Sequence, residues 1–231
     1  MDKRIHYILM LDTETANTID DNGKLDMSNV LVYDIGWQVI DKQGRVYEKK
    51  SYVIEDIFFG MPDLMKSAYY AHKIPQYLED IKSGKRKVER FYKMRLDLLD
   101  TIRRYNIKTV CAHNSRFDVN ALNITQRYLS KSKYRYFFHY GIEIWDSLKM
   151  ASDTIGKQKS YIEWCKRNNY MTKHAKPRPR LTAEILYRYL AGIYDFTESH
   201  TGLEDVEIET KILAHCFRQH KKMRKKLYEK A

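Results

Sequence analysis

The chain has 231 residues, 43% of them hydrophobic, which is enough for a packed core in one domain. No apolar run approaches the roughly 20 residues that cross a bilayer, and the N-terminus lacks a small-residue cleavage site, so we expect an intracellular, cytoplasmic protein without membrane contact. Lysine and arginine total 42 against 30 acidic residues, a formal net charge of +12. This excess favours a polyanionic partner, and the 19 tyrosines would suit stacking on single-stranded bases.

The first quarter of the chain predicts an antiparallel meander of three strands. Apolar runs at 5–12 and 30–40 have the composition of buried strands. The second run is followed by a glycine-containing turn at 41–44 and a third β-rich run at 45–54, which together indicate a hairpin.

Helices and strands alternate in the middle of the chain, which indicates parallel strands added to the meander. The expected elements are a helix at 90–107, a strand at 107–113, a helix at 116–129 and a strand at 142–146. The last third is expected to be mostly helical and to end in a basic helix at about 219–231. The chain is thus predicted to be a single α/β domain, residues 1–231, with a five-stranded mixed sheet flanked by helices.

Two basic segments interrupt this pattern. Residues 55–89 separate the meander from the next helix, are rich in tyrosine and lysine, and are interpreted as an insertion. Residues 170–180 are expected to form a loop, because Pro177 and Pro179 disfavour a helix there.

Several sulfur-containing, acidic and aromatic residues are interpreted as structural. The three cysteines are Cys111, Cys165 and Cys216. Their odd number and wide spacing match neither a zinc motif nor a disulfide framework, so buried reduced thiols are expected. Asp146, at a strand end, is expected to cap the following helix, and Trp145 and Trp164 are expected in the core.

Two carboxylates stand at the end of the first predicted strand, in the sequence LDTET. Asp12 and Glu14 are two residues apart, so on a strand their side chains point to the same face. Like charges a few ångströms apart repel each other unless a cation lies between them. The pair therefore indicates either a metal site or an exposed strand end that enters a turn.

Two further motifs place acids next to helix starts. Asp118, in AHNSRFD, follows a strand and begins a helix for which Asn114 is a reasonable N-cap. Asp205, in HTGLEDVEIE, lies in the first turn of the last long helix, five residues after the loop residue His200. Ordinary helix-start charges and a surface histidine are the alternative interpretation of these motifs.

The order of the three motifs resembles that of the DEDD superfamily of 3′–5′ exonucleases. The His-x4-Asp spacing of the last motif is similar to that of the His-containing branch, DEDDh, which has the ribonuclease-H-like fold and includes proofreading-type exonuclease domains and RNase T-like enzymes. IWDSLKMA and RLTAEILYRYL also resemble family segments, so the resemblance covers about 5–54 and 90–218 and leaves out 55–89. One small departure is Gly202, where the family more often has alanine.

The resemblance implies a site for two divalent cations, Mg²⁺ or Mn²⁺. In this site Asp12 bridges the two ions, Glu14 and Asp205 bind the first, and Asp118 binds the second. His200 is the implied general base. Carboxylate oxygens suit hard cations of this kind, and an imidazole titrates near neutral pH, where a base must act.

The acids around Asp205 have a simpler interpretation. Glu204, Glu207 and Glu209 are expected to be helix-start charges on the solvated side of the last helix. Glu209 is one turn from Asp205, however, and could instead support the metal ligands from behind.

Substrate contacts are expected from two places. By resemblance, the backbone near Thr13 and Thr15 contacts the terminal nucleotide, with Asn114 and Phe117 close by. In the insertion, three cations would follow the phosphates of the strand while tyrosines stack on bases. These cations are Lys85, Arg86 and Lys87. The alternative for the insertion is a solvated helical hairpin that covers one edge of the sheet.

The expected function is metal-dependent removal of nucleoside monophosphates from the 3′ end of a nucleic acid. Single-stranded DNA is the first expectation for the substrate, and trimming of RNA 3′ ends is the nearest alternative. A nucleic-acid-binding module without catalysis is a third interpretation, which the complete set of five site residues disfavours. A polymerase or another replication protein is a possible partner.

Overall fold

A computed structural model of the chain describes residues 2, 4–16, 22, 24, 28, 30–130 and 135–229. Its strands are β1 (Ile8–Ala16), β2 (Leu31–Ile40), β3 (Val46–Ile54), β4 (Lys87–Glu89), β5 (Thr109–Ala112) and β6 (Glu143–Asp146). They form one sheet in the order β4-β3-β2-β1-β5-β6, in which β1, β2 and β3 pair antiparallel and the remaining pairs are parallel. The predicted mixed sheet is confirmed. The sixth strand, β4, comes from the end of the insertion.

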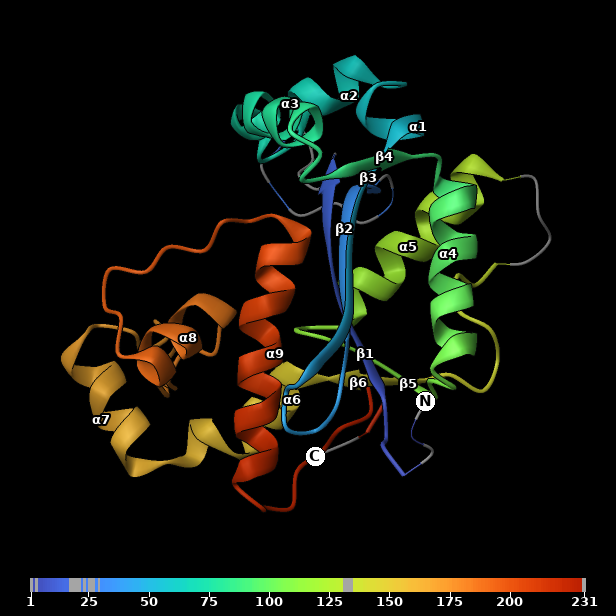
Figure 1. Cartoon of the computed structure of the whole chain (residues 1–231). Coiled ribbons are helices and arrows are strands. Elements are labelled where there is room, and N and C mark those ends of the chain that lie inside the picture. The colour runs from blue at the N-terminus through green and yellow to red at the C-terminus, as the bar shows by residue number, and fades with distance from the viewer. Residues whose placement is uncertain are drawn as a thin grey trace.

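Helices cover both faces of the sheet (Figure 1). One face carries α4 (Phe91–Arg104) and α5 (Arg116–Leu129). The other carries α6 (Ser147–Asp153), α7 (Lys159–Arg167), α8 (Ala183–Ala191) and α9 (Gly202–Arg218). The insertion contributes α1 (Glu55–Phe58), α2 (Pro62–Ser67) and α3 (Ile74–Lys82), which lie across one end of the sheet.

The alternation of side chains along β1 supplies both layers of the core. Leu9 and Leu11 pack into the cluster that includes α4 and α5, whereas Ile8 and Met10 pack into the cluster that includes α9. Because side chains two residues apart share a face, Asp12 and Glu14 continue the α9 side of this strand. The apolar run of β1 therefore aims both acids at the start of α9.

The C-terminal segment is not the basic helix expected over 219–231. Helix α9 ends at Arg218, and residues 219–229 are not helical. The amide of Asp146 donates to the carbonyl of Lys225 at 2.8 Å, so the segment pairs with the edge strand β6. Its backbone groups satisfy a sheet edge, which competes with helix formation and covers an otherwise open edge.

The residues interpreted as structural have the expected positions. The three cysteines are buried and free, and Trp145 and Trp164 are both buried. The carboxylate of Asp146 accepts a hydrogen bond from the amide of Leu148 at 3.0 Å and caps α6. Among the described residues, no helix has the length and apolar character needed to cross a membrane.

Candidate active site

The last residues of β1 contribute side chains to the site from both faces of the sheet. Thr13 points to the α5 side, where its amide and hydroxyl both donate to Asp118 Oδ1, at 3.1 and 2.9 Å. Asp118 lies in the first turn of α5 and is buried. These two bonds fix the Asp118 carboxylate beside the strand end that carries Asp12 and Glu14.

The first turn of α9 holds Asp205 against β2. The Asp205 carboxylate accepts a hydrogen bond from the amide of Thr201 at 3.2 Å. The amide of Gly202 donates to Asp34 Oδ2, on β2, at 3.0 Å. A Cβ on Gly202 would lie 2.6 Å from the backbone nitrogen of Gly36, so only glycine allows this approach without a shift of backbone.

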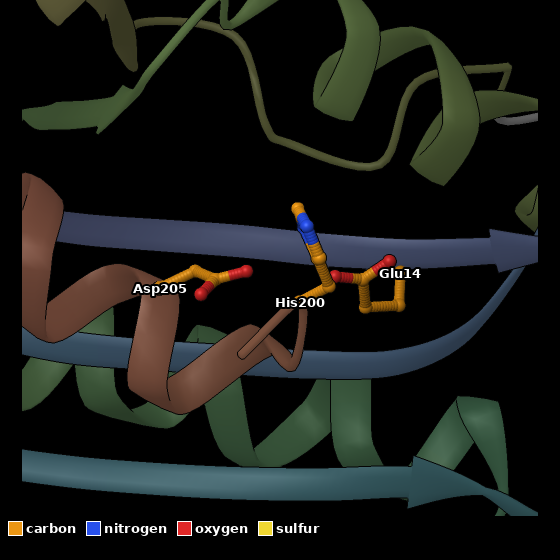
Figure 2. A group of neighbouring side chains, drawn as sticks. All are labelled: Glu14, His200 and Asp205. Carbon is orange, nitrogen blue, oxygen red and sulfur yellow. The ribbon is translucent and has the colours of Figure 1, made fainter. Parts of the chain in front are cut away.

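His200 lies in the loop that joins α8 to α9. Figure 2 shows its imidazole between Glu14 on β1 and Asp205 on α9. One ligand atom from each of these three side chains lies within 4.8 Å of the others. His200 has a φ of +48°, in the left-handed region that few non-glycine residues adopt. The loop conformation thus brings the histidine to the carboxylates.

The site concentrates negative charge in a buried place. Burial and the neighbouring carboxylates raise the pKa of Asp12 and Glu14 well above its usual range. Burial raises the pKa of Asp118 to about 7, and burial together with Glu198 raises that of Asp205 to about 8. Hard divalent cations fit such a donor set, because they bind carboxylate oxygens and neutralise the repulsion among them.

Glu209 does not lie on the solvated side of α9, although the neighbouring acids in the sequence suggested that position. Its side chain is only 3% exposed, lines the same pocket, and its Oε2 makes no hydrogen bond within the described part of the chain. Burial and the charges of Asp118 and Asp205 raise its pKa well above the usual range. The expectation of a solvated position is wrong because positions four apart on a helix share a face.

Asp34 anchors the start of α9, a role that the sequence motifs did not indicate. It is fully buried on β2, and its Oδ2 accepts hydrogen bonds from the amide of Gly202 and the hydroxyl of Tyr77. One signal was present: it is the only acid in the apolar run VLVYDIGWQVI. A buried acid requires partners, which here are the start of α9 and the insertion.

The residues expected to contact the substrate near the strand end line one pocket. Thr13, Thr15, Asn114 and Phe117 line a broad pocket together with Asp12, Glu14, His200 and Asp205. Asp118, the fifth residue of the family pattern, does not line the pocket and lies beside it, hydrogen-bonded to Thr13. Asn114 is not the N-cap of α5, however. Ser115 occupies that position, and Asn114 adopts a φ of +69° while its amide donates to Asp146.

The expected cations of the insertion have other partners. The Arg86 side chain is 1% exposed, and its guanidinium contacts Asp34, Asp80 and Glu204 at 3.4, 2.9 and 2.8 Å. Lys85 pairs with Glu204 at 2.8 Å. Lys87 is exposed and lies over the ring of Tyr52, on β3. The assignment of Arg86 to phosphate binding is therefore wrong, because its charge is buried and already paired.

A different basic segment faces the pocket. Residues 171–180 form a short hairpin, in which the amide of Thr172 donates to the carbonyl of Arg178 at 2.8 Å. Its pocket-lining cationic side chains include Lys176, Arg178 and Arg180, all of them exposed. Tyr69 and Tyr70 of the insertion also line the pocket. The pocket lining thus combines carboxylates with exposed cations and aromatic rings.

Comparison with solved structures identifies the class of fold. A full-length 3′-exonuclease is similar over 97% of this chain and 88% of its own, with 12% identity and a TM-score of 0.65. The nuclease domain of 3′hExo, a DEDDh family member bound to rAMP, is similar over 98% of this chain and all of its own, with 12% identity and a TM-score of 0.58. The chain therefore has the fold of the DEDDh 3′-exonucleases, as the resemblance implied.

A third structure extends the comparison to a DNA complex. E. coli Exonuclease I in complex with a dA16 oligonucleotide is similar over 92% of this chain and 41% of its own, with 15% identity and a TM-score of 0.54. No protein-family model and no curated protein sequence matches the chain. The similarity is thus one of fold, and the chemistry must be argued from the site residues.

Proposed function

We propose that the protein is a metal-dependent 3′–5′ exonuclease that releases nucleoside monophosphates from the 3′ end of a nucleic acid. One observation carries the proposal: the fold brings Asp12, Glu14, His200 and Asp205 to one pocket and holds Asp118 beside it through Thr13. These residues come from the end of β1, the start of α5, the loop before α9 and the first turn of α9. The five residues are spread over 194 positions of the sequence, so their proximity is a product of the fold.

The site residues have distinct roles under this proposal. Asp12, Glu14, Asp118 and Asp205 would hold two divalent ions, Mg²⁺ or Mn²⁺. Bound ions of this kind clamp the phosphate and promote ionisation of the attacking water. Burial and the nearby charge of Lys73 lower the pKa of His200, which favours the neutral form of its imidazole. A neutral ring nitrogen can accept the proton of the attacking water.

The side chains that line the pocket suit a single-stranded substrate. The exposed cations of the hairpin 171–180 are suited to the phosphates of a strand, and the exposed ring of Tyr69 is suited to a base. DNA is the first choice and RNA the alternative. The similar folds include both substrates, since E. coli Exonuclease I was solved with a DNA oligonucleotide and a 3′-exonuclease structure concerns recognition of a histone mRNA stem-loop.

Degradation of end-labelled strands tests the proposal. The protein should shorten 5′-labelled DNA or RNA from the 3′ end in single-nucleotide steps with Mg²⁺ or Mn²⁺, and a chelator should stop the reaction. Asp12→Asn should lose the activity, and His200→Ala should lose on the order of 10²–10⁴ in rate, as for a general base. Comparing the two ladders identifies the preferred sugar.

A binding measurement separates the metal site from catalysis. Mn²⁺ should raise the melting temperature of the wild type, because an ion that binds only the folded state stabilises it. The shift should be much smaller for Asp12→Asn. Full turnover by Asp12→Asn would contradict the two-metal assignment, and strand binding without any turnover by the wild type would favour a silent binding module.

A further inference from the structure

The insertion reaches the active site through Tyr70. The ring of Tyr70 is stacked on the imidazole of His200, with centroids 4.5 Å apart and an angle of 17° between the planes. Lys73, one turn further on, donates a hydrogen bond to the carbonyl of Ser199. Its ammonium group also lies 5.3 Å from the centroid of the Tyr70 ring. The insertion therefore contacts both the side chain and the backbone of the loop that carries the histidine.

Among the described residues, hydrogen bonding provides little orientation for the His200 imidazole. The carboxylate of Glu198 comes within ion-pair range, but its Oε2 is 3.9 Å from Nδ1, beyond hydrogen-bond range. In many sites a third group hydrogen-bonds the base and fixes the direction of its ring. A stack of two parallel rings restricts the same torsions by packing, and aromatic pairs add about 0.5–1.5 kcal/mol beyond the buried area.

The insertion is held in place relative to α9, so the stack has a defined position. The hydroxyl of Tyr77, on α3, donates a hydrogen bond to Asp34 at 2.7 Å. Asp34 also accepts a hydrogen bond from the backbone amide of Gly202. Arg86 joins the same carboxylate to Glu204 in the first turn of α9. The helix start that carries Asp205 and the segment that carries Tyr70 thus share one buried anchor.

We propose that Tyr70 is a positioning residue, which holds the His200 ring in the direction needed to accept a proton from the attacking water. The inference rests on the proposed function and gives the insertion a part in it. Tyr70 also lines the pocket, so direct stacking on a nucleotide base is the competing role. The two roles differ in the kinetic constant that they change and in their dependence on His200.

A double-mutant cycle tests the inference. Tyr70→Ala should lower kcat about tenfold, part of the range for a general base, with little change in KM. Tyr70→Phe should restore kcat because the ring, not the hydroxyl, makes the stack. In a His200→Ala background, Tyr70→Ala should have no further effect on kcat. Tyr92→Ala is a matched control, since Tyr92 is an exposed tyrosine outside the pocket lining.

A spectroscopic readout checks the stack without turnover. The ring protons of His200 should move downfield in the NMR spectrum of Tyr70→Ala and stay in place in Tyr70→Phe, because the Tyr70 ring current is lost only in the first variant. The same spectra show whether each variant is folded.

The possible failures are distinguishable. A raised KM that persists in the His200→Ala background would assign Tyr70 to substrate binding and overturn the inference. An active wild type with unchanged kcat in Tyr70→Ala would overturn it as well, while leaving the proposed function intact. An inactive wild type would overturn the proposed function itself and, with it, the positioning role of Tyr70.

Discussion

Two basic regions of the protein look alike in sequence and differ in structure. The insertion, residues 55–89, directs Arg86 inward to three carboxylates and so joins itself to β2 and α9. The hairpin, residues 171–180, pairs its backbone with itself and leaves its cations exposed at the pocket. Cationic composition alone therefore does not separate a structural anchor from a ligand-binding surface. The two are distinguished by whether each cation is paired with a carboxylate of the protein.

The largest expected effect is the loss of the insertion's anchor. Arg86→Met removes a buried charge and leaves Asp34 without its cation, which should lower the free energy of unfolding by about 3–5 kcal/mol. Lys87→Met, at the neighbouring exposed position, should change it by less than about 1 kcal/mol. Urea unfolding at pH 7 measures both. Equal stability of the two variants would break the contrast between the regions.

The hairpin should show the opposite behaviour, with strand binding affected and stability spared. Lys176→Ala/Arg178→Ala should weaken binding of single-stranded DNA and lower the salt slope of log affinity by about 0.7 per lost phosphate contact. The backbone bonds of the hairpin do not use these side chains, so the fold should persist. Lys221→Ala/Lys222→Ala removes the same charge from the C-terminal segment. An identical fall in slope for that control would indicate non-specific attraction.

The smallest expected effect is a difference in pH dependence between the insertion's anchor on α9 and the acids of the site. Bonds from Lys85, Thr201 and Arg86 outweigh burial and lower the pKa of Glu204 to about 2, so its contribution to stability is lost only as the pH falls from about 4 towards 2. Asp118 and Asp205 have raised pKa values, about 7 and about 8. The folded state then binds more protons than the unfolded state, so metal-free stability falls as the pH rises from about 4 to 8.

A single substitution tests whether repulsion among the acids of the site lowers the metal-free stability at high pH. In chelator, Asp12→Asn should stabilise the protein at pH 8, on the order of 1 kcal/mol, because it removes a charge from a crowded site. At pH 5 the neighbouring carboxyl groups are protonated and the gain should shrink. Thermal melts at the two pH values provide the comparison, and a gain of equal size at both would argue against charge repulsion as its cause.

The sequence predicted those features that depend on local order along the chain. Periods of two and 3.6 residues predict three such features. They are the shared strand face of Asp12 and Glu14, the helix-start position of Asp118 and the meander. The sixth strand and the roles of Asp34 and Arg86 were not predictable in this way, since each depends on contacts between segments up to 168 positions apart. Glu209 lies between these cases, because its spacing from Asp205 was visible but its burial was not.

The contact between Gly36 and Gly202 has a consequence for the stiffness of the site. A Cβ on either residue would come within 2.6 Å of the other segment's backbone, so β2 and the start of α9 touch main chain to main chain. Side chains can change rotamer and let their neighbours drift, whereas peptide planes in contact cannot yield without moving a whole element. The separation between the acids of β1, which is hydrogen-bonded to β2, and Asp205 of α9 is consequently set by the backbone itself.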